Sequence, residues 1–372
     1  MKVKVKDIVA AIEEWAPRDF AEEWDNPGLQ IGDPEQEVSR VVVALDVDDR
    51  VVEAAEKRGA ELIVSHHPLL YRELKNLAGG TPLNRLLLRL ARAGIVVYSA
   101  HTNLDSCPGG INDELARLLG LEQVSVLHPV KRRSYYKIVV FVPRDHAEKV
   151  REAMCRTGAG YIGNYSDCTF RTPGIGTFRP LPGTNPYLGQ QGKLEEVEEV
   201  RLETVVPAPL VDEVVAAMLA AHPYEEVAYD LYRVEQVAPG AGLGRVGLLP
   251  EPLPLGDLAR KVKETLKVES LRVGGDLAKP VQKIALCGGG GMALLPRVLA
   301  VKADVFITSD IKYHEARDAE AAGLAFIDAG HWETERIIVP RMAEYLRQQA
   351  AARGWELEVA VEEGRGIPYR AW

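Results

Sequence analysis

The sequence predicts an α/β fold made of two related lobes with mostly parallel sheets, interrupted by an inserted ferredoxin-like α+β domain. Short β-branched strands alternate with amphipathic helices near both ends of the 372-residue chain. This alternation is typical of parallel strands joined by right-handed crossovers. The rhythm changes in the middle of the chain, where Gly and Pro become frequent. We therefore expect an N-terminal lobe over residues 1–127, an insert over 128–238 and a C-terminal lobe over 239–372.

The first lobe opens with an amphipathic helix and continues with three predicted strands. Apolar residues at helical spacing predict two further helices, over residues 50–57 and 84–93, and Gly59 ends the first of these. The strands are residues 41–47 (VVVALDV), 61–65 (ELIVS) and 95–100 (IVVYSA).

The last lobe repeats this pattern, with predicted helices over residues 292–301 and 316–322. Its strands are residues 283–287 (KIALC), 304–308 (DVFIT) and 324–329 (LAFIDA). The stretch AELIVSHHPLLYRE is similar to ADVFITSDIKYHEA, and GIVVYSAHTNLD is similar to GLAFIDAGHWETE. The similarity suggests an internal duplication, and chance likeness between α/β units is the alternative.

The insert shows a strand–helix–strand pattern twice, which is the split βαβ pattern of ferredoxin-like domains. Helices are expected over residues 146–157 and 209–221. Strands are expected over residues 135–142, 197–206 and 228–233. The Gly/Pro-rich residues 174–192 are either a lid or an exposed loop.

Composition and charge exclude several classes of protein. The net charge of −9 argues against a general nucleic-acid or acidic-membrane binder, because nothing offsets the repulsion by phosphate groups. No secretory leader and no transmembrane span of about 18 apolar residues is recognisable. The four cysteines are scattered and form no CxxC pair, which fits a reducing compartment. We therefore expect a cytoplasmic protein.

Histidines and carboxylates follow three of the predicted strands, in SHHP, HTNLD and GHWETE. Ligands bind beyond the carboxyl ends of parallel strands, because loops and helix N-termini converge there. Mixed His and carboxylate ligands suit zinc, manganese, iron or cobalt. Five ligands with two carboxylates suit two ions better than one. The sequence therefore predicts a two-metal site formed by His66, His67, Asp105, His331 and Glu335.

Each of these motifs also has a simpler interpretation. Adjacent strand residues point to opposite faces, but Pro68 ends the strand, so both imidazoles of the HH pair can face one cavity. His331 and Glu335 are four residues apart, which places them on one face of a helix. Taken alone, the HH pair is a turn pair and Asp105 a helix N-cap before Pro108. Their shared position at strand ends favours the metal site.

The sequence indicates further candidate site residues less strongly. His101 and His314 are candidate catalytic groups, with metal ligation, support of a ligand or substrate contact as alternatives. Lys312 and the glycines Gly289 and Gly290 are candidate substrate-binding residues, with a surface salt bridge and a tight turn as alternatives. In the insert, His222, Glu225 and Glu226 form either a structural turn, which is favoured, or a small-molecule or metal contact.

These motifs together resemble the Nif-three-like family, also known as type 2 GTP cyclohydrolase I homologues. The resemblance rests on SHHPLL, HTNLD and GHWETE in this order, supported by EEWDNPGLQIGD, GLGRVG and TSDIKYHEA. The insert, with GAGYIGNYSDCTF and HPYEEVAYD, is similar to that of the longer bacterial members. It implies a ferredoxin-like domain of the PII or CutA type.

The resemblance implies a dinuclear site with the five ligands named above, and all five positions are filled. It also implies a toroidal homohexamer with metal sites facing an internal cavity and the insert over its openings. We expect a metal-dependent hydrolase acting on a small anionic substrate, a nucleotide or phosphoester, GTP cyclohydrolase-like by resemblance. The alternative is a non-catalytic metal-handling or ligand-sensing protein. No direct nucleic-acid or membrane partner is expected.

Overall fold

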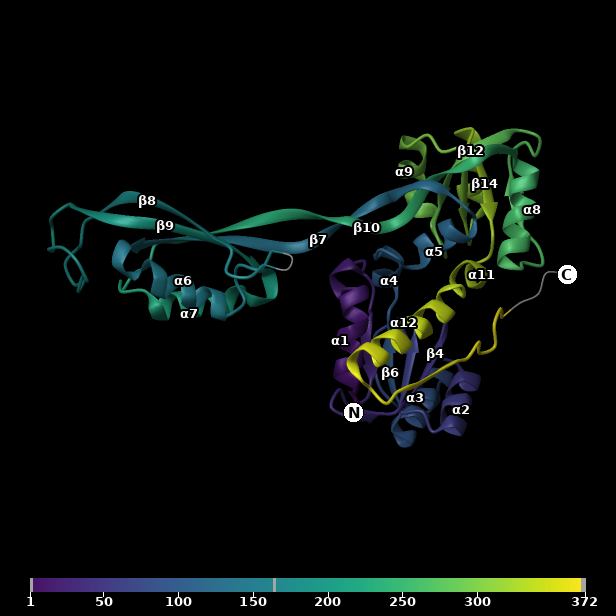
Figure 1. Ribbon diagram of the computed structural model, residues 1–372, viewed down its shortest axis with the longest axis horizontal. Helices are drawn as coiled ribbons and strands as arrows, with labels where there is room; N and C mark the ends of the chain where they lie inside the picture. The colour runs from purple at the N-terminus through teal and green to yellow at the C-terminus, as the bar shows by residue number, and fades with distance from the viewer. Residues whose placement is uncertain (1–2, 163–164, 369–372) are drawn as a thin grey trace. The chain divides into compact units, whose positions relative to one another are not determined.

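The computed structural model describes residues 3–162 and 165–368, apart from the side chains of residues 131–134 and 235–239 (Figure 1). The chain forms two compact units. The first contains Met1–Val130 and Ala238–Trp372, and the second contains Lys131–Val237. Strands β7 (Glu122–Pro143) and β10 (Tyr229–Pro254) carry the chain from the first unit into the second and back. None of the described helices has the length and apolarity needed to span a bilayer.

The first unit contains a five-stranded sheet that is mostly parallel, as predicted. Its order is β15 (Glu358–Val361), β4 (Arg40–Ala44), β5 (Leu62–Ser65), β6 (Val96–Ser99) and β2 (Gly28–Ile31). Only β2 runs antiparallel to its neighbour. A small two-stranded sheet, β1 (Val3–Lys4) with β3 (Glu37–Val38), lies beside α1 (Val5–Trp15) in the chain.

The C-terminal segment completes this N-terminal sheet. Strand β15 pairs in parallel with β4, and α12 (Ile338–Arg353) packs on the same sheet. The expected C-terminal lobe over residues 239–372 is therefore not self-contained. The pairing with β15 covers the outer edge of β4, which would otherwise expose unpaired backbone groups.

Helices cover both faces of this sheet (Figure 1). Alternate residues of the central strands, such as Val41 and Val43, pack against α1 and α12. The residues between them, such as Val42 and Ala44, pack against α2 (Asp49–Arg58) and α3 (Pro82–Ala93). Burial on both faces explains why these strands are continuous apolar runs. Helix α2 begins after Asp48, whose side chain accepts two backbone N–H bonds, and ends at Gly59 with φ of +61°.

The second sheet of this unit is mixed. Its order is β11 (Arg272–Gly274), β14 (Ala325–Asp328), β13 (Val305–Thr308), β12 (Pro280–Leu286) and β10. The three central strands are parallel, whereas β10 and β11 run antiparallel to their neighbours. Helices α5 (Ile111–Leu118) and α8 (Leu255–Leu266) cover one face. Helices α9 (Leu295–Ala300) and α10 (Tyr313–Ala321) cover the other face. The expected helix over residues 292–301 is divided into a 3-10 turn, Met292–Leu294, and α9.

An ion pair between a buried arginine and a half-buried aspartate ties β10 to α5 in the same unit. Arg245 is 2% exposed, and its Nε lies 2.5 Å from Oδ1 of Asp113. Its Nη1 also donates to the carbonyl oxygens of Gly242 and Gly244. Removing Asp113 would leave the charge of Arg245 buried without this partner, which is destabilising.

The second unit has the strand–helix–strand order expected of it, twice. Between β7 and β10 lie α6 (Ala147–Arg156), β8 (Thr169–Phe178), β9 (Glu195–Pro207) and α7 (Val211–Ala221). Strand β9 lies between β7 and β8 and is antiparallel to both. Both helices pack on this sheet through residues such as Val150 and Met218.

Part of the Gly/Pro-rich stretch is a strand and not a loop. Residues 174–178 belong to β8, and only residues 179–194 join β8 to β9. Strand β8 lies at the edge of the sheet, where Pro173 needs no N–H donor on its open side. The composition of this stretch suggested a loop because Pro and Gly are rare in central strands.

Candidate metal centre

All five predicted ligand residues come together in the first unit, with His101 beside them. His66 and His67 follow β5, and His101 follows β6. Asp105 lies on the short helix α4 (Thr102–Ser106), and the last two residues lie on α11 (His331–Glu335), which follows β14. Both sheets thus contribute at the carboxyl ends of parallel strands, as the sequence predicted.

Glu335 lies at the centre of the cluster. Its Oε2 is 2.8 Å from Nε2 of His67 and 3.1 Å from Nε2 of His331. The same oxygen is 3.9 Å from Nε2 of His66. The prediction that His331 and Glu335 share one helix face is correct, because α11 places them one turn apart. Glu335 is 3% exposed, so its carboxylate is committed to this cluster.

His66 and Asp105 each point a buried polar atom into the cluster without a partner. His66 Nε2 and Asp105 Oδ1 lie 3.8 Å apart, and neither has a hydrogen-bond partner among the described residues. Such atoms cost about 1–3 kcal/mol each when they stay unsatisfied. A cation between them would satisfy both, so these residues fit a metal ion. Asp105 is not a helix cap, since the N-cap of α5 is Gly110.

In all four histidines of the cluster, the same ring nitrogen, Nδ1, faces an acceptor oxygen. In each, Nδ1 lies within hydrogen-bond distance of an oxygen that can only accept. The pairs are His66 with the carbonyl of Ala100 at 2.8 Å, His67 with Asp46 at 2.8 Å, His101 with Asp25 at 2.7 Å and His331 with Asp310 at 2.6 Å. A proton on Nδ1 leaves Nε2 free to bind a metal, which is the usual arrangement of metal-ligating histidines.

The Nε2 atoms and carboxylates form two overlapping groups. His66, His67 and His101 offer ligand atoms within 4.8 Å of one another, and so do His67, His331 and Glu335. His and Glu groups that can hold a metal ion are therefore present.

The pKa of a histidine in the cluster is lowered or raised according to the groups that surround its ring. Burial lowers the pKa of His66 to about 3. Burial also lowers the pKa of His67, but hydrogen bonds with Asp46 and Glu335 outweigh it and raise the pKa to about 10. For His331, burial is likewise outweighed by Glu335 and Asp310, which raise its pKa to about 9. Without a metal, protonated His67 and His331 both donate from Nε2 towards the Glu335 carboxylate.

The pKa values of the two carboxyl groups in the cluster, Asp105 and Glu335, are shifted in opposite directions. Burial, and then the charge of Glu335, raise the pKa of Asp105 well above its usual range. Burial also acts to raise the pKa of Glu335, but hydrogen bonds from His331 and His67 lower it well below its usual range. Two buried carboxylates this close cannot both ionise freely. A divalent cation would let both ionise.

A cavity of about 640 Å³ opens beside the cluster. His67, His101 and Glu335 form part of its wall, together with the aromatic side chains of Trp24 and Tyr71. These two aromatic residues are 59% and 60% exposed, and their ring centroids lie 6.1 Å apart. None of the described residues that line the cavity is Lys or Arg. The described lining of the cavity therefore offers aromatic side chains and histidines but no Lys or Arg.

Two predicted residues lie apart from this cavity. Lys312 and His314 are exposed at the start of α10, and neither is among the residues that line the cavity. The backbone N–H of Lys312 caps α10 by donating to Glu315. The ring of His314 lies against Tyr313, with centroids 5.3 Å apart.

The glycine run 288–291 packs against the cluster. The N–H groups of Gly288, Gly289 and Gly291 donate to side chains of the protein, namely Asn112, Thr334 and Thr308. These three N–H groups are therefore not free to cradle a phosphate group. Gly290 lines the cavity. A Cβ at Gly289 would lie 2.1 Å from Oε1 of Glu335, so only glycine allows this close approach.

The sequence did not single out the carboxylates that orient the histidines. Asp46 comes just after β4, so its position at the end of a strand is the same feature that pointed to the ligand residues. Asp25 precedes β2 and carries no such signal; its Oδ2 also accepts from the N–H of Thr102 at 3.0 Å. Asp310 follows β13, and its Oδ2 lies 2.6 Å from Nδ1 of His331.

Comparison with known proteins gives one family over nearly the whole chain. The family described as Duf34/NIF3 (NGG1p interacting factor 3) matches residues 3–365. A Halalkalibacterium halodurans protein named "GTP cyclohydrolase 1 type 2 homolog" is 41% identical over 362 residues, 97% of both chains. A Bacillus subtilis protein of the same name is 40% identical over 367 residues, 99% of this chain and 98% of its own.

Two solved structures have a similar fold over the whole chain. A Bacillus cereus protein related to NIF3 has a TM-score of 0.75 at 39% identity, covering 100% of this chain and 99% of its own. A Staphylococcus aureus protein has a TM-score of 0.82 at 28% identity, with the same coverage.

Proposed function

This chain belongs to the Duf34/NIF3 family, and from that premise we propose that it is a hydrolase dependent on two divalent metal ions. The observation that carries the proposal is the pair of buried, unpartnered atoms, His66 Nε2 and Asp105 Oδ1, beside the Glu335 carboxylate. A substrate-sized cavity beside them favours catalysis over storage. The substrate class is a nucleotide or another phosphoester.

Two ligand groups would share Glu335. His66 and Asp105 would hold one ion with Glu335, and His67 and His331 would hold the other. This mixture of imidazole and carboxylate suits zinc, manganese, iron or cobalt. Bound divalent ions supply Lewis acidity that polarises a phosphoryl oxygen and neutralises its charge.

His101 would move a proton at Nε2. Its Nδ1 is held by Asp25, and the histidine lines the cavity beside His66 and His67. Burial acts to raise the pKa of Asp25, but hydrogen bonds from His101 and Thr102 outweigh it and lower the pKa. An ionised Asp25 accepts from Nδ1 of His101 and so fixes its tautomer, as expected of the partner of a general acid–base group. His314 has no part in this proposal.

The cavity wall suggests how a substrate lies. Trp24 and Tyr71 offer faces on which a flat ring can stack. Because the described lining has no Lys or Arg, the phosphate groups of a nucleotide would have to lie at the metal ions. This orientation supports cleavage of a phosphoester more than attack on the ring of GTP.

We also propose the finer features that the resemblance implies. The second unit would be a ferredoxin-like domain of the PII or CutA type, since its elements follow that order. The chain would assemble as a toroidal homohexamer. A cytoplasmic location is supported by four cysteines that form no disulfide.

Elemental analysis of untagged protein, purified without added metal, tests the proposal. The comparison is a His67→Ala, Glu335→Ala double variant, with His314→Ala, Glu320→Ala on exposed α10 as the matched control. Each protein is then assayed on GTP, GMP and bis(4-nitrophenyl) phosphate. We expect about two ions per chain, lost together with hydrolysis in the first variant only.

The other outcomes separate the alternatives. Two ions without hydrolysis of any substrate would favour a metal-handling or ligand-sensing protein. Release of a ring-opened product from GTP would favour the cyclohydrolase reaction over phosphoester cleavage. Absence of metal even after reconstitution would overturn the proposal.

A further inference from the structure

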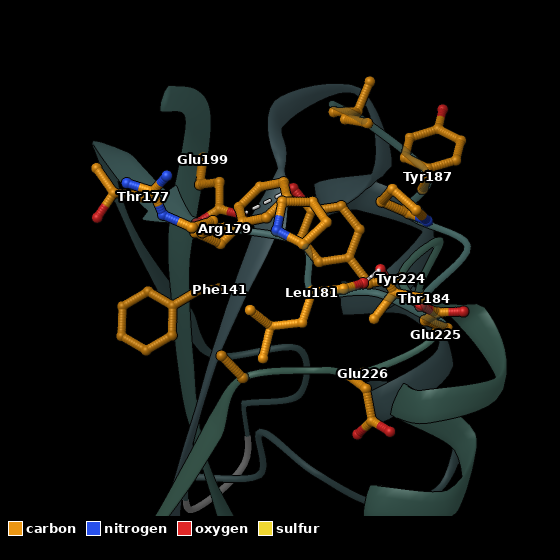
Figure 2. A pocket seen from close by; sticks show the side chains of 16 residues that line it. Phe141, Thr177, Arg179, Leu181, Thr184, Tyr187, Glu199, Tyr224, Glu225 and Glu226 are labelled. Carbon is orange, nitrogen blue, oxygen red and sulfur yellow. Dashed lines mark hydrogen bonds between the residues drawn. The ribbon is translucent and has the colours of Figure 1, made fainter. Parts of the chain in front are cut away.

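A second cavity, of about 510 Å³, lies within the second unit, against the loop that joins β8 to β9 (Figure 2). Its walls come from β7, β8, β9, this loop and the turn that follows α7, all inside Lys131–Val237. The volume is in the range of small-molecule sites, about 300–1,000 Å³. None of the residues proposed for metal binding or hydrolysis lies in this unit.

Aromatic rings form one side of this cavity. The ring of Tyr224 lies 5.9 Å from that of Phe178 and 6.3 Å from that of Tyr187, measured between centroids. Phe141 and Leu181 extend the apolar wall (Figure 2). These rings offer faces to a flat apolar group and to a cation, which an aromatic face attracts within about 6 Å.

The charged side chains around the cavity are mostly acidic. Glu199, Glu225 and Glu226 line it, against a single basic residue, Arg179. The Arg179 guanidinium donates to the carbonyl of Gly192 at 2.6 Å and so joins the two ends of the loop. No ion pair links Glu199 or Glu226 to a Lys or Arg among the described residues. The cavity therefore has an excess of negative charge.

Glu199 is held in a fixed position. Its Oε1 accepts a hydrogen bond from the Tyr224 hydroxyl at 2.9 Å, drawn as a dashed line in Figure 2. Its Oε2 lies over the backbone of β8, where a Cβ at Gly176 would approach it to 2.0 Å. Burial, and then the Glu199 carboxylate, raise the pKa of Tyr224, so the tyrosine is the donor of this pair. Oε2 of Glu199 therefore remains available to accept a hydrogen bond from a ligand.

The loop over the cavity is also held. The backbone N–H of Asn185 donates to Oε1 of Glu225 at 2.9 Å, which fastens the loop to the turn after α7. His222, in the same turn, is structural, because its ring bonds to the carbonyl of Phe141 and to the N–H of Tyr224. The favoured interpretation of His222 as a turn residue fits this, whereas Glu225 and Glu226 face the cavity.

We propose that this cavity binds a small organic cation with a flat apolar body, of the arylalkylamine class. Its ammonium group would donate to Oε2 of Glu199, and its ring would lie against Phe178, Tyr187 and Tyr224. An anion would be repelled by three carboxylates. A neutral ligand without a donor group would remove water from Glu199 without replacing the lost hydrogen bonds, and a neutral donor would replace them with an uncharged and weaker one.

Isothermal titration calorimetry of the full chain with three ligands of the same ring tests this site. Tryptamine, tryptophol and indole-3-acetate differ mainly in carrying an ammonium, a hydroxyl or a carboxylate. We expect tryptamine to bind saturably, one per chain, tryptophol to bind at least about 10-fold more weakly because it lacks a charged hydrogen bond, and indole-3-acetate not to bind. Equal affinity for tryptamine and tryptophol, or no saturable binding of tryptamine, would overturn the proposal.

Three variants locate the charge that matters. Glu199→Gln keeps the shape and the acceptor for Tyr224, and it is expected to weaken tryptamine binding about 10-fold or more. Glu198→Gln removes a neighbouring carboxylate whose side chain is 80% exposed, and it should leave affinity unchanged. Tyr224→Phe keeps the ring and frees Oε1 of Glu199, so tryptamine affinity should be kept or increased. Equal loss in Glu198→Gln and Glu199→Gln, or a large loss in Tyr224→Phe, would contradict the site.

Discussion

Oε2 of Glu335 lies 2.8 Å from Nε2 of His67, although 268 positions of the chain separate the two residues. His67 follows a strand of the first sheet, and Glu335 lies on the helix that follows β14 of the second sheet. The cluster therefore exists only while both sheets of the first unit are assembled. Metal ions bound there would link the folding of the two sheets.

The first prediction concerns metal removal. All five tryptophans lie outside residues 131–237, so tryptophan fluorescence reports on the first unit alone. Chelation should lower the unfolding midpoint in urea, with a loss of about 2.7 kcal/mol for each bound ion if free metal was at 100 times its Kd. In Glu335→Gln, chelation should have little further effect. Identical curves with and without chelator in the unaltered protein would contradict this prediction.

The second prediction is the pH dependence of metal binding. Without metal, the pKa values of His67 and His331 are raised to about 10 and about 9, so both are protonated at pH 7.5. Metal needs the deprotonated Nε2 of both histidines and an ionised Asp105, so binding should release at least about two protons and strengthen as pH rises towards 9. His66, with its pKa lowered to about 3, should release none. Calorimetry in two buffers of different ionisation enthalpy counts the protons, and a count of zero would refute the coupling.

The third prediction concerns the carboxylates that orient histidines. Asp46→Asn and Asp310→Asn should each weaken metal affinity about 10- to 100-fold, because an amide favours the wrong tautomer of the histidine it faces. Asp49→Asn, an exposed change at the start of α2, is the control. Competition with a metal-sensitive dye gives the affinities. If all three variants bind metal like the parent protein, Asp46 and Asp310 have no orienting role.

The fourth prediction separates crowding from backbone strain at Gly289. Its φ is +63°, and an added Cβ would lie 2.1 Å from Oε1 of Glu335. Gly323 has a similar φ of +71° with open space around it. Both Gly→Ala changes should cost about 1 kcal/mol of stability from the left-handed backbone. Gly289→Ala alone should also reduce the metal content, measured by elemental analysis, and an unchanged content would argue against close packing at the cluster.

The fifth prediction tests whether His101 is a general acid–base group or a metal ligand. His101→Gln should keep both ions and lower kcat about 10²- to 10⁴-fold, as expected when a general acid–base group is lost. Asp25→Asn should lower kcat in the same direction by a smaller factor. Metal content and the pH profile of kcat are measured for both variants. Loss of one ion in His101→Gln would instead make His101 a ligand.

The predictable part of the structure is local. Strands β5, β6, β13 and β14 are short, continuous apolar runs, and each was expected within about two residues of its observed ends. Because parallel strands place their carboxyl ends on one edge, the same reasoning brought the five ligand residues together. Helix α11 followed from the four-residue spacing of His331 and Glu335.

The unpredicted part depends on contacts between distant segments. Asp25 and Asp46 are single acidic residues whose partners are set by the tertiary fold. No local pattern marks Asp25, and the position of Asp46 after β4 does not identify the histidine that it faces. Strand β8 contains Pro173 and two glycines, and only its place at the sheet edge makes these acceptable. The parallel pairing of β15 with β4 likewise brings together residues more than 300 positions apart, such as Val359 and Val41.

The late arrival of β15 has a consequence for biosynthesis. A ribosome makes the chain from its N-terminus, so β4 waits with an open edge until residues 358–361 emerge. His331 and Glu335 also emerge after the second unit, so the complete metal site can form only once residue 335 has left the ribosome. The second unit is translated entirely within this interval and has its own core. A ribosome stalled before residue 358 should therefore carry a folded second unit beside an aggregation-prone, metal-free first sheet.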